Sequence, residues 1–216
     1  MSAEQVDAGC SFDGENDRLF VVGIGASAGG LEAIEEFLQN MPADSGAAFV
    51  IVQHLSSDFK SLLKELLERD TRMKIYRVTD GMELAANSIY LIPSDKNLIL
   101  EGQNLRLVKR EDDKKHQSHQ KDWKPNFPID LFFNSLAQNY QEYAIGVVLS
   151  GTGSDGSIGL KAISEAGGIA LVQEPSTAEF NDMPSSAISI LNLQEATKES
   201  VKKINQVGSP TEVAGE

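Results

Sequence analysis

The chain has 216 residues, of which 41% are hydrophobic and 24% charged, as in ordinary globular proteins. Acidic residues outnumber basic ones 32 to 19, and the net charge of -13 argues against binding to nucleic acid or to an anionic membrane surface. The single cysteine excludes an internal disulfide framework, and the longest apolar runs are too short to span a bilayer. We therefore expect a cytoplasmic protein with no nucleic-acid partner and no membrane insertion.

The first part of the chain alternates between buried strands and amphipathic helices. Residues 1–17 are polar and acidic, and we predict a flexible N-terminal segment there. Apolar, β-branched runs predict strands, and apolar residues at helical spacing predict helices. The strands are expected at 19–25, 47–52 and 74–78, and the helices at 31–38 and 62–67. This alternation is typical of parallel strands joined by right-handed crossovers.

The pattern changes between residues 82 and 108, where short alternating runs at 88–92, 97–100 and 105–108 predict an antiparallel hairpin annex. Residues 109–126 are charged and polar and are interpreted as a solvated loop. Helices are then expected at 129–136, 158–163, 185–191 and 196–204, and strands at 144–149 and 168–172, the latter as the last central strand. The sequence thus predicts a single doubly wound α/β domain over 18–205, with a mainly parallel sheet, helices on both faces and a flexible tail at 206–216.

The first strand ends in the glycine-rich run Gly23–Gly30, in which two motifs overlap. G-x-G-x-x-A is a loose dinucleotide fingerprint, whereas G-x-S-x-G, which includes Ser27, has the spacing of a nucleophile elbow. Both need small residues, because the strand must turn sharply into a helix whose first amides stay uncovered. Those amides can hold a phosphate or a developing oxyanion.

The end of the second strand favours the nucleophile elbow. A dinucleotide site needs an acidic residue there to bind the ribose, but this chain has Gln53 and His54. A neutral imidazole is suited to taking a proton from Ser27 on the neighbouring strand end. His54 considered alone is more simply a structural histidine.

The end of the third long strand carries Asp155 in the run Ser150–Gly156. This aspartate is placed either to cap the following helix or to orient a histidine. No G-K-[ST] sequence accompanies the glycines, which argues against a Walker loop. Spacing alone leaves a Ser27, His54 and Asp155 triad about as well supported as a nucleotide-binding or anion-binding nest.

The ordered set of motifs resembles the catalytic domain of the CheB family of chemotaxis protein-glutamate methylesterases, over about residues 20–192. In that family the nucleophilic serine, the histidine and the aspartate lie in motifs that fall on Ser27, His54 and Asp155. The motifs that carry the resemblance are Gly23–Gly30, Gln53-His54, Asp80-Gly81, Tyr90–Lys96, Ile129–Phe133, Ser150–Gly156 and Met183–Ile188.

The resemblance implies hydrolysis of glutamate γ-methyl esters on chemoreceptors, with deamidation of receptor glutamines as a second reaction. Backbone amides near Ala28 and around Thr152 are then expected to hold the oxyanion, and no metal or organic cofactor is required. The Gly-Thr-Gly-Ser-Asp-Gly run and Ala28 are most similar to methylesterase domains of methylesterase–methyltransferase sensor fusions. Fused or separate methyltransferase and sensor domains are therefore the expected partners, besides a methylated chemoreceptor.

Two further functions are compatible with parts of the sequence. A catalytically idle domain that binds partners within a sensory assembly is the first, although an intact set of Ser27, His54 and Asp155 weighs against it. A nucleotide-binding module is the second, and it depends on Gly23, Gly25 and Ala28.

Overall fold

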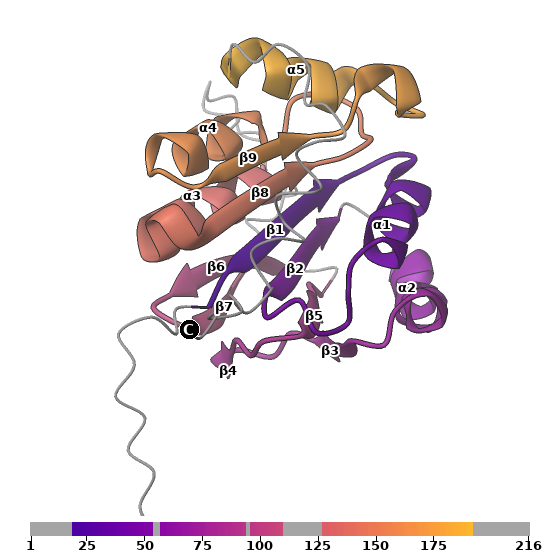
Figure 1. Cartoon of the computed structure of the whole chain (residues 1–216), viewed down its shortest axis with the longest axis vertical. Helices are drawn as coiled ribbons and strands as arrows, with labels where there is room; N and C mark the ends of the chain where they lie inside the picture. The colour runs from indigo at the N-terminus through magenta and orange to yellow at the C-terminus, as the bar shows by residue number, and fades with distance from the viewer. Residues whose placement is uncertain (1–18, 54–56, 94–95, 110–126, 192–216) are drawn as a thin grey trace, which may run out of the picture.

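The computed structural model describes residues 19–53, 57–93, 96–109 and 127–191. Within these residues the strands form one six-stranded sheet and one three-stranded sheet, and helices cover the larger sheet (Figure 1). The predicted N-terminal segment, the C-terminal tail, most of the predicted loop 109–126 and the predicted helix 196–204 lie outside the described residues.

The six-stranded sheet is parallel throughout, in the order β3-β5-β2-β1-β8-β9. All residues of β1, β2 and β8 are buried, which explains their continuous apolar sequences: a strand covered on both faces has no solvent side to make polar. The strands are β1 (Val21–Ala26), β2 (Ala48–Gln53), β3 (Lys74–Arg77), β5 (Ser88–Leu91), β8 (Ala144–Val148) and β9 (Ile169–Val172).

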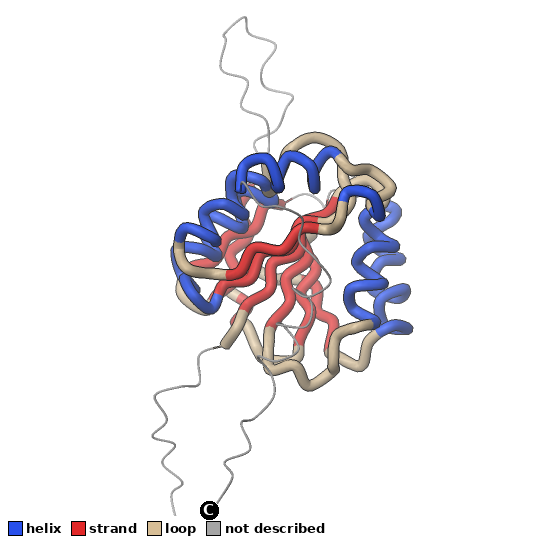
Figure 2. The backbone as a smooth tube through the Cα atoms, turned by 45° about the horizontal axis from the view of Figure 1, so that its top comes forward, coloured by secondary structure: helices blue, strands red, loops and turns tan. Residues whose placement is uncertain are grey.

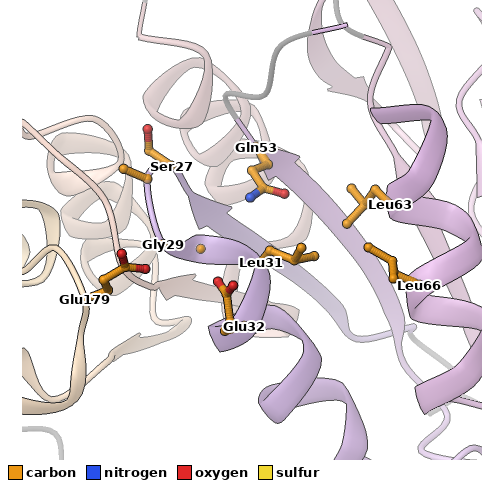
Figure 3. A pocket seen from close by; sticks show the side chains of 10 residues that line it. Ser27, Gly29, Leu31, Glu32, Gln53, Leu63, Leu66 and Glu179 are labelled. Atoms are coloured by element: carbon orange, nitrogen blue, oxygen red, sulfur yellow. The ribbon is translucent and has the colours of Figure 1, made fainter. Parts of the chain in front are cut away.

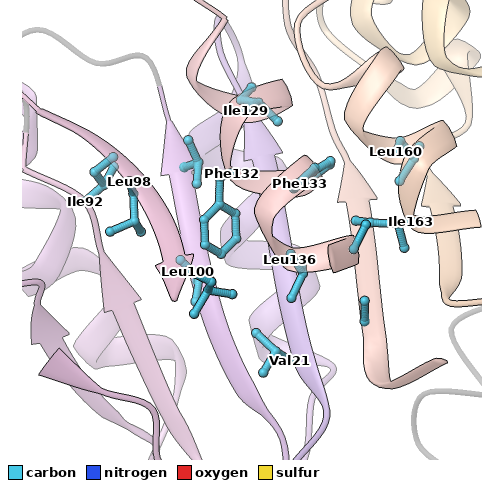
Figure 4. Packing of buried hydrophobic residues seen from close by; sticks show 14 of the residues in the cluster. Val21, Ile92, Leu98, Leu100, Ile129, Phe132, Phe133, Leu136, Leu160 and Ile163 are labelled. Atoms are coloured by element: carbon cyan, nitrogen blue, oxygen red, sulfur yellow. The ribbon is translucent and has the colours of Figure 1, made fainter. Parts of the chain in front are cut away.

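Helices cover both faces of this sheet, as predicted, and Figure 2 shows the strands between the two helical layers. On one face α1 (Gly30–Gln39) and α2 (Ser57–Asp70) bury Ile34, Leu38 and Leu67 against the sheet. On the other face lie α3 (Pro128–Tyr140), α4 (Ser157–Glu165) and α5 (Asp182–Leu191). In Figure 4, Phe132 and Phe133 of α3 lie over the sheet, with Leu160 and Ile163 of α4 beside them.

The antiparallel annex consists of β4 (Met82–Glu83), β6 (Lys96–Glu101) and β7 (Asn104–Lys109), in the order β4-β7-β6. It packs on α3, because Leu98 and Leu100 belong to the same buried cluster as Phe132. Hydrogen bonds fix this contact, since the amide of Leu100 donates to Ser135 Oγ at 3.0 Å and Asn139 donates to the Leu100 carbonyl at 3.1 Å.

Two details of the predicted strand arrangement are wrong. Residues 88–92 were expected in the antiparallel annex, but β5 lies inside the parallel sheet between β2 and β3. Their alternating pattern predicted a hairpin strand, yet every residue of β5 is buried, and the Tyr90 hydroxyl accepts a hydrogen bond from the Ala85 amide at 2.8 Å. Residues 168–172 were expected as a central strand, but β9 forms an edge of the sheet. None of the described helices is both long and apolar enough to cross a membrane.

Candidate active site

Ser27 stands on the turn between β1 and α1, at the carboxyl edge of the sheet. The turn is tight: the Gly30 amide donates to the Ser27 carbonyl at 3.1 Å, and Gly29 has a φ of 64°, which favours glycine. A Cβ atom on Gly29 would also lie 2.6 Å from Glu179 Oε2 and 2.8 Å from Ser150 Oγ. The glycines therefore hold a sharp bend that leaves the Ser27 side chain partly exposed.

The turn after β8 lies directly against Ser27. The Ser27 amide donates to the Ser150 carbonyl at 3.0 Å, and Ser150 Oγ donates to the Ala28 carbonyl at 2.9 Å. A Cβ atom on Gly151 would lie 2.9 Å from Ser27 Cβ. Gln173, which follows β9, accepts a hydrogen bond from the Ser150 amide at 2.8 Å. Ser150 thus couples the two turns, a role that the spacing of residues within the run Ser150–Gly156 does not indicate.

Asp155 is buried, with 8% of its surface exposed, at the end of this second turn. Its carboxylate accepts hydrogen bonds from the amides of Ile129 at 3.1 Å and Asp130 at 2.9 Å. Burial raises the pKa of Asp155 to about 6, although these backbone hydrogen bonds lower it, and the nearby Asp130 raises it further.

The interpretation of Asp155 as a cap for the following helix is wrong. The N-cap residue of α4 is Gly156, which has no side chain to cap the helix. Asp155 instead accepts from the first turn of α3, where a carboxylate is also favoured by the helix dipole. Asp130 of α3 makes the reciprocal contact, accepting from the Gly159 amide of α4 at 2.7 Å. Two buried carboxylates therefore join the starts of α3 and α4.

His54 lies outside the described residues, so the structure does not test its predicted position. The strand that leads to it is described: Gln53 pairs in register with Ala26, the residue that precedes Ser27. The structure thus brings together the turns of Ser27 and Asp155 and the end of β2.

A pocket of about 260 Å³ opens beside Ser27 (Figure 3). Gln53 lies at the end of β2, Leu63 and Leu66 project from α2, and Glu32 and Glu179 lie near Gly29. The described residues that line the pocket are Ser27, Ala28, Gly29, Gly30, Leu31, Glu32, Gln53, Leu63, Leu66 and Glu179.

Two glycines of the loose dinucleotide fingerprint have a packing role. A Cβ atom on Gly23 would lie 2.9 Å from the ring of Phe133, and one on Gly25 would overlap Ile129. These glycines let α3 approach β1 closely, which explains them without a bound nucleotide. Among the described residues, no group of three histidine, cysteine or acidic side chains could hold a metal ion.

The fold and the site define a class: a doubly wound α/β domain whose polar side chains gather at the carboxyl ends of adjacent parallel strands, the usual place for chemistry in such sheets. A family model described as CheB methylesterase matches residues 22–206. The chain belongs to the CheB methylesterase family.

Individual relatives agree with this assignment. A putative protein-glutamate methylesterase/protein-glutamine glutaminase of Leptospira interrogans is 35% identical over 168 residues, which are 76% of this chain and 81% of the relative. An uncharacterized 104.1 kDa protein of Rhodobacter capsulatus is 44% identical over 126 residues. Those residues are 58% of this chain, but the match spans only 12% of that longer relative.

The fold is also that of a solved structure. The CheB methylesterase catalytic domain of Thermotoga maritima superposes with a TM-score of 0.69 at 22% sequence identity. The match covers 88% of this chain and 99% of that domain. It confirms the predicted fold class.

Proposed function

We propose that this chain is a serine hydrolase that demethylates glutamate γ-methyl esters on methylated chemoreceptors and deamidates glutamine as a second reaction. One observation carries the proposal: a chain of this family presents Ser27 on a partly exposed turn that is hydrogen-bonded to the turn bearing a buried carboxylate, Asp155. The Leptospira relative carries both activities in its name, which supports the choice of substrates.

The proposed reaction is acyl transfer through Ser27. Its hydroxyl oxygen attacks the ester carbonyl carbon while His54 takes the hydroxyl proton, and His54 then donates that proton to the departing methanol. Water attacks the acyl-enzyme, with His54 again as the base, and releases glutamate and free Ser27. Asp155 holds the imidazole in the required tautomer and stabilises the imidazolium. With glutamine as substrate, ammonia replaces methanol.

The oxyanion is assigned to the backbone amides of Ala28 and Thr152. The amides just before them have other partners, since Ser27 donates to the Ser150 carbonyl and Gly151 donates to the Phe180 carbonyl, each at 3.0 Å. Those two bonds fix both turns close to Ser27. Donors held in place before the reaction stabilise the developing charge without reorganisation.

The test is methanol release from a methylated chemoreceptor fragment by the wild-type chain and by Ser27→Ala. We expect release by the wild type and a loss of about 10⁴-fold or more in the variant, as for other nucleophile deletions. Full activity of Ser27→Ala would overturn the assignment of the nucleophile.

A serine-directed phosphonate separates the remaining possibilities. Labelling of Ser27 that depends on His54, without methanol release, would indicate a live hydrolase with another substrate. Absence of both would favour the idle partner-binding domain, and retention of NAD or ATP in equilibrium dialysis would favour the nucleotide-binding module. An unaltered Ser27, His54 and Asp155 set supports the enzyme over both alternatives.

The wider setting is also proposed. The acidic composition and single cysteine support a cytoplasmic location. The size of the Rhodobacter relative supports fusion to further domains, which we expect to be methyltransferase and sensor domains. Mass spectrometry of the intact protein in its source cells would test the fusion.

A further inference from the structure

Gln53 has a buried carboxamide that forms no hydrogen bond with the described part of the protein. The residue is 3% exposed, and neither Nε2 nor Oε1 has a hydrogen-bond partner among the described residues. Buried polar groups are normally hydrogen-bonded, because burying one without a partner opposes folding. An exception inside a candidate active site indicates that the partner arrives with a ligand.

A second glutamine in the same sheet shows what a structural role looks like. Gln173 directly follows the last residue of β9, whereas Gln53 is the last residue of β2. The Oε1 of Gln173 accepts from the Ser150 amide at 2.8 Å, and its Nε2 donates to the Thr177 carbonyl at 3.3 Å. Both ends of the Gln173 carboxamide therefore hold the fold together, whereas those of Gln53 do not.

The Gln53 pocket, lined by the ten residues named above, lies next to the proposed nucleophile. In Figure 3 the Gln53 side chain extends from the end of β2 into the space between Leu31 and Ser27. Gly30 makes room for it, since a Cβ atom there would lie 3.3 Å from Gln53 Nε2. The exposed carboxylates of Glu32 and Glu179 lie at the same pocket, and no basic side chain lines it among the described residues.

We propose that Gln53 binds an uncharged amide of the protein substrate and thereby selects the residue that neighbours the reacting glutamyl group. This inference rests on the proposed function, because Ser27 lines the same pocket. A carboxamide donates and accepts, and its best complement is another amide. A substrate carboxylate could only accept, and it would be repelled by Glu32 and Glu179.

The size of the pocket indicates which part of the substrate enters. A volume of about 260 Å³ accommodates a side chain but not an α-helix, whose diameter with side chains is roughly 10 Å. The apolar walls from Leu31, Leu63 and Leu66 suit the methylene groups of such a side chain. The amide is therefore the side-chain amide of glutamine or asparagine, or a main-chain amide at an unwound end of the substrate.

The test compares helical peptides that each carry one glutamyl γ-methyl ester. Glutamine, leucine or glutamate is placed three or four residues from the ester, where it lies on the same helix face. For the wild type we expect kcat/KM for methanol release to be about tenfold higher with glutamine than with leucine, the effect of one hydrogen-bonded buried group, and lowest with glutamate. For Gln53→Leu the preference for glutamine over leucine should disappear.

A minimal substrate distinguishes the two sources of the amide. N-acetyl-glutamate γ-methyl ester N-methylamide has main-chain amides but no neighbouring side chain. If Gln53→Leu hydrolyses it as fast as the wild type, the side-chain amide is the ligand; if the variant is about tenfold slower, the main-chain amide is.

Controls separate binding from folding and from damage to the proposed catalytic residues. Comparison of the peptides within each variant cancels any change in the reactivity of Ser27, which the rate of phosphonate labelling reports separately. Gln53→Leu should unfold at the same or a higher urea concentration, because it replaces a buried amide without hydrogen bonds by an apolar group. Gln173→Leu should unfold at a lower concentration, because it loses the hydrogen bonds to Ser150 and Thr177. An unchanged glutamine preference in Gln53→Leu would overturn the inference. So would the absence of a preference in the wild type, if Gln53→Leu also hydrolyses the minimal substrate as fast as the wild type.

If no peptide releases methanol, the proposed ester substrate is wrong, and the pocket is then tested by binding alone. The side-chain NH₂ resonances of Gln53 are assigned by their loss in Gln53→Leu. A shift of these resonances with the glutamine peptide but not the leucine peptide would support the inference. Equal shifts with the two peptides would indicate a main-chain amide, and absent shifts would overturn the inference.

Discussion

The turn after β1 and the turn after β8 have similar compositions, serine and glycine at the carboxyl edge of one sheet, but they place their functional side chains in opposite environments. Ser27 is partly exposed beside a pocket, whereas Asp155 is 8% exposed and held by two backbone amides of α3. What packs over each turn makes the difference: α3 covers the second turn, and the first opens to solvent. Small residues are compatible with an exposed and with a buried functional side chain, and the elements that pack over the turn determine which is found.

After Ser27→Ala, the largest expected effect is on the buried side of this comparison. Asp155→Asn should lower methanol release by about 10³–10⁴-fold, since an amide cannot orient the histidine as a carboxylate does. It should also lower the free energy of unfolding by about 1–3 kcal/mol, because the new NH₂ group would face a backbone N–H.

The matched control is Asp130→Asn. This residue also accepts a backbone amide, from Gly159, but has no proposed part in the reaction. We expect a similar loss of stability in urea unfolding and a far smaller loss of methanol release. Equal losses of activity in the two variants would show that Asp155 acts only through the fold.

The pH dependence of stability sharpens the same contrast. The pKa of Asp155 is about 6 in the folded chain against an ordinary value of 3.8, so the folded state holds the proton more tightly. The stabilisation from this proton is complete below pH 4 and is lost as the pH rises through 6, a change of about 3 kcal/mol. Urea unfolding of the wild type and Asp155→Asn from pH 4 to 7 should show their difference decline over that window.

The opposite pH dependence of this stability difference would indicate a different environment for Asp155. If the wild type gains stability relative to Asp155→Asn as the pH rises, a cation faces the carboxylate and outweighs its burial. Activity should fall below about pH 6 in either case, because the proposed mechanism needs an ionised Asp155 and a neutral His54.

The sequence was sufficient to predict the fold class and the first turn. Continuous apolar runs identify β1, β2 and β8, because these strands are covered on both faces, and small residues around Ser27 signal a strand that bends sharply into a helix. β5 was misplaced because its short alternating pattern is typical of a hairpin strand. The hydroxyl groups of Tyr90 and Ser88 form hydrogen bonds with backbone groups of nearby residues, so both side chains can be buried. A periodicity pattern does not indicate such hydrogen bonds.

The contacts that assemble the site could not be predicted. Ser150 binds the carbonyl of Ala28, 122 residues away, and Asp155 caps a helix that begins 27 residues before it. The residues around Asp155 in the sequence do not indicate whether its carboxylate contacts α3 or the helix that follows it in the chain, α4. The unused amide of Gln53 is likewise visible only when its surroundings are known.

Gly151→Ala tests how closely the two turns are fitted. The added methyl group would overlap the Met183 sulfur and lie 2.9 Å from Ser27 Cβ, so Ser27 must move. A displacement of about 1 Å at a reacting group costs about 100-fold in rate, and we expect that loss in methanol release. Urea unfolding should show a loss of about 1–3 kcal/mol from overpacking. Wild-type activity in this variant would mean that the second turn does not position Ser27.

Gly153→Ala is the matched variant, two residues further along the same turn, and has the smallest expected effect. A Cβ atom on Gly153 meets nothing within 4 Å, so crowding plays no part. Its φ of 83° nevertheless disfavours alanine, and the free energy of unfolding should fall by about 1 kcal/mol with methanol release unchanged. If Gly153→Ala lost as much activity as Gly151→Ala, backbone conformation rather than packing against Ser27 would be what the second turn contributes.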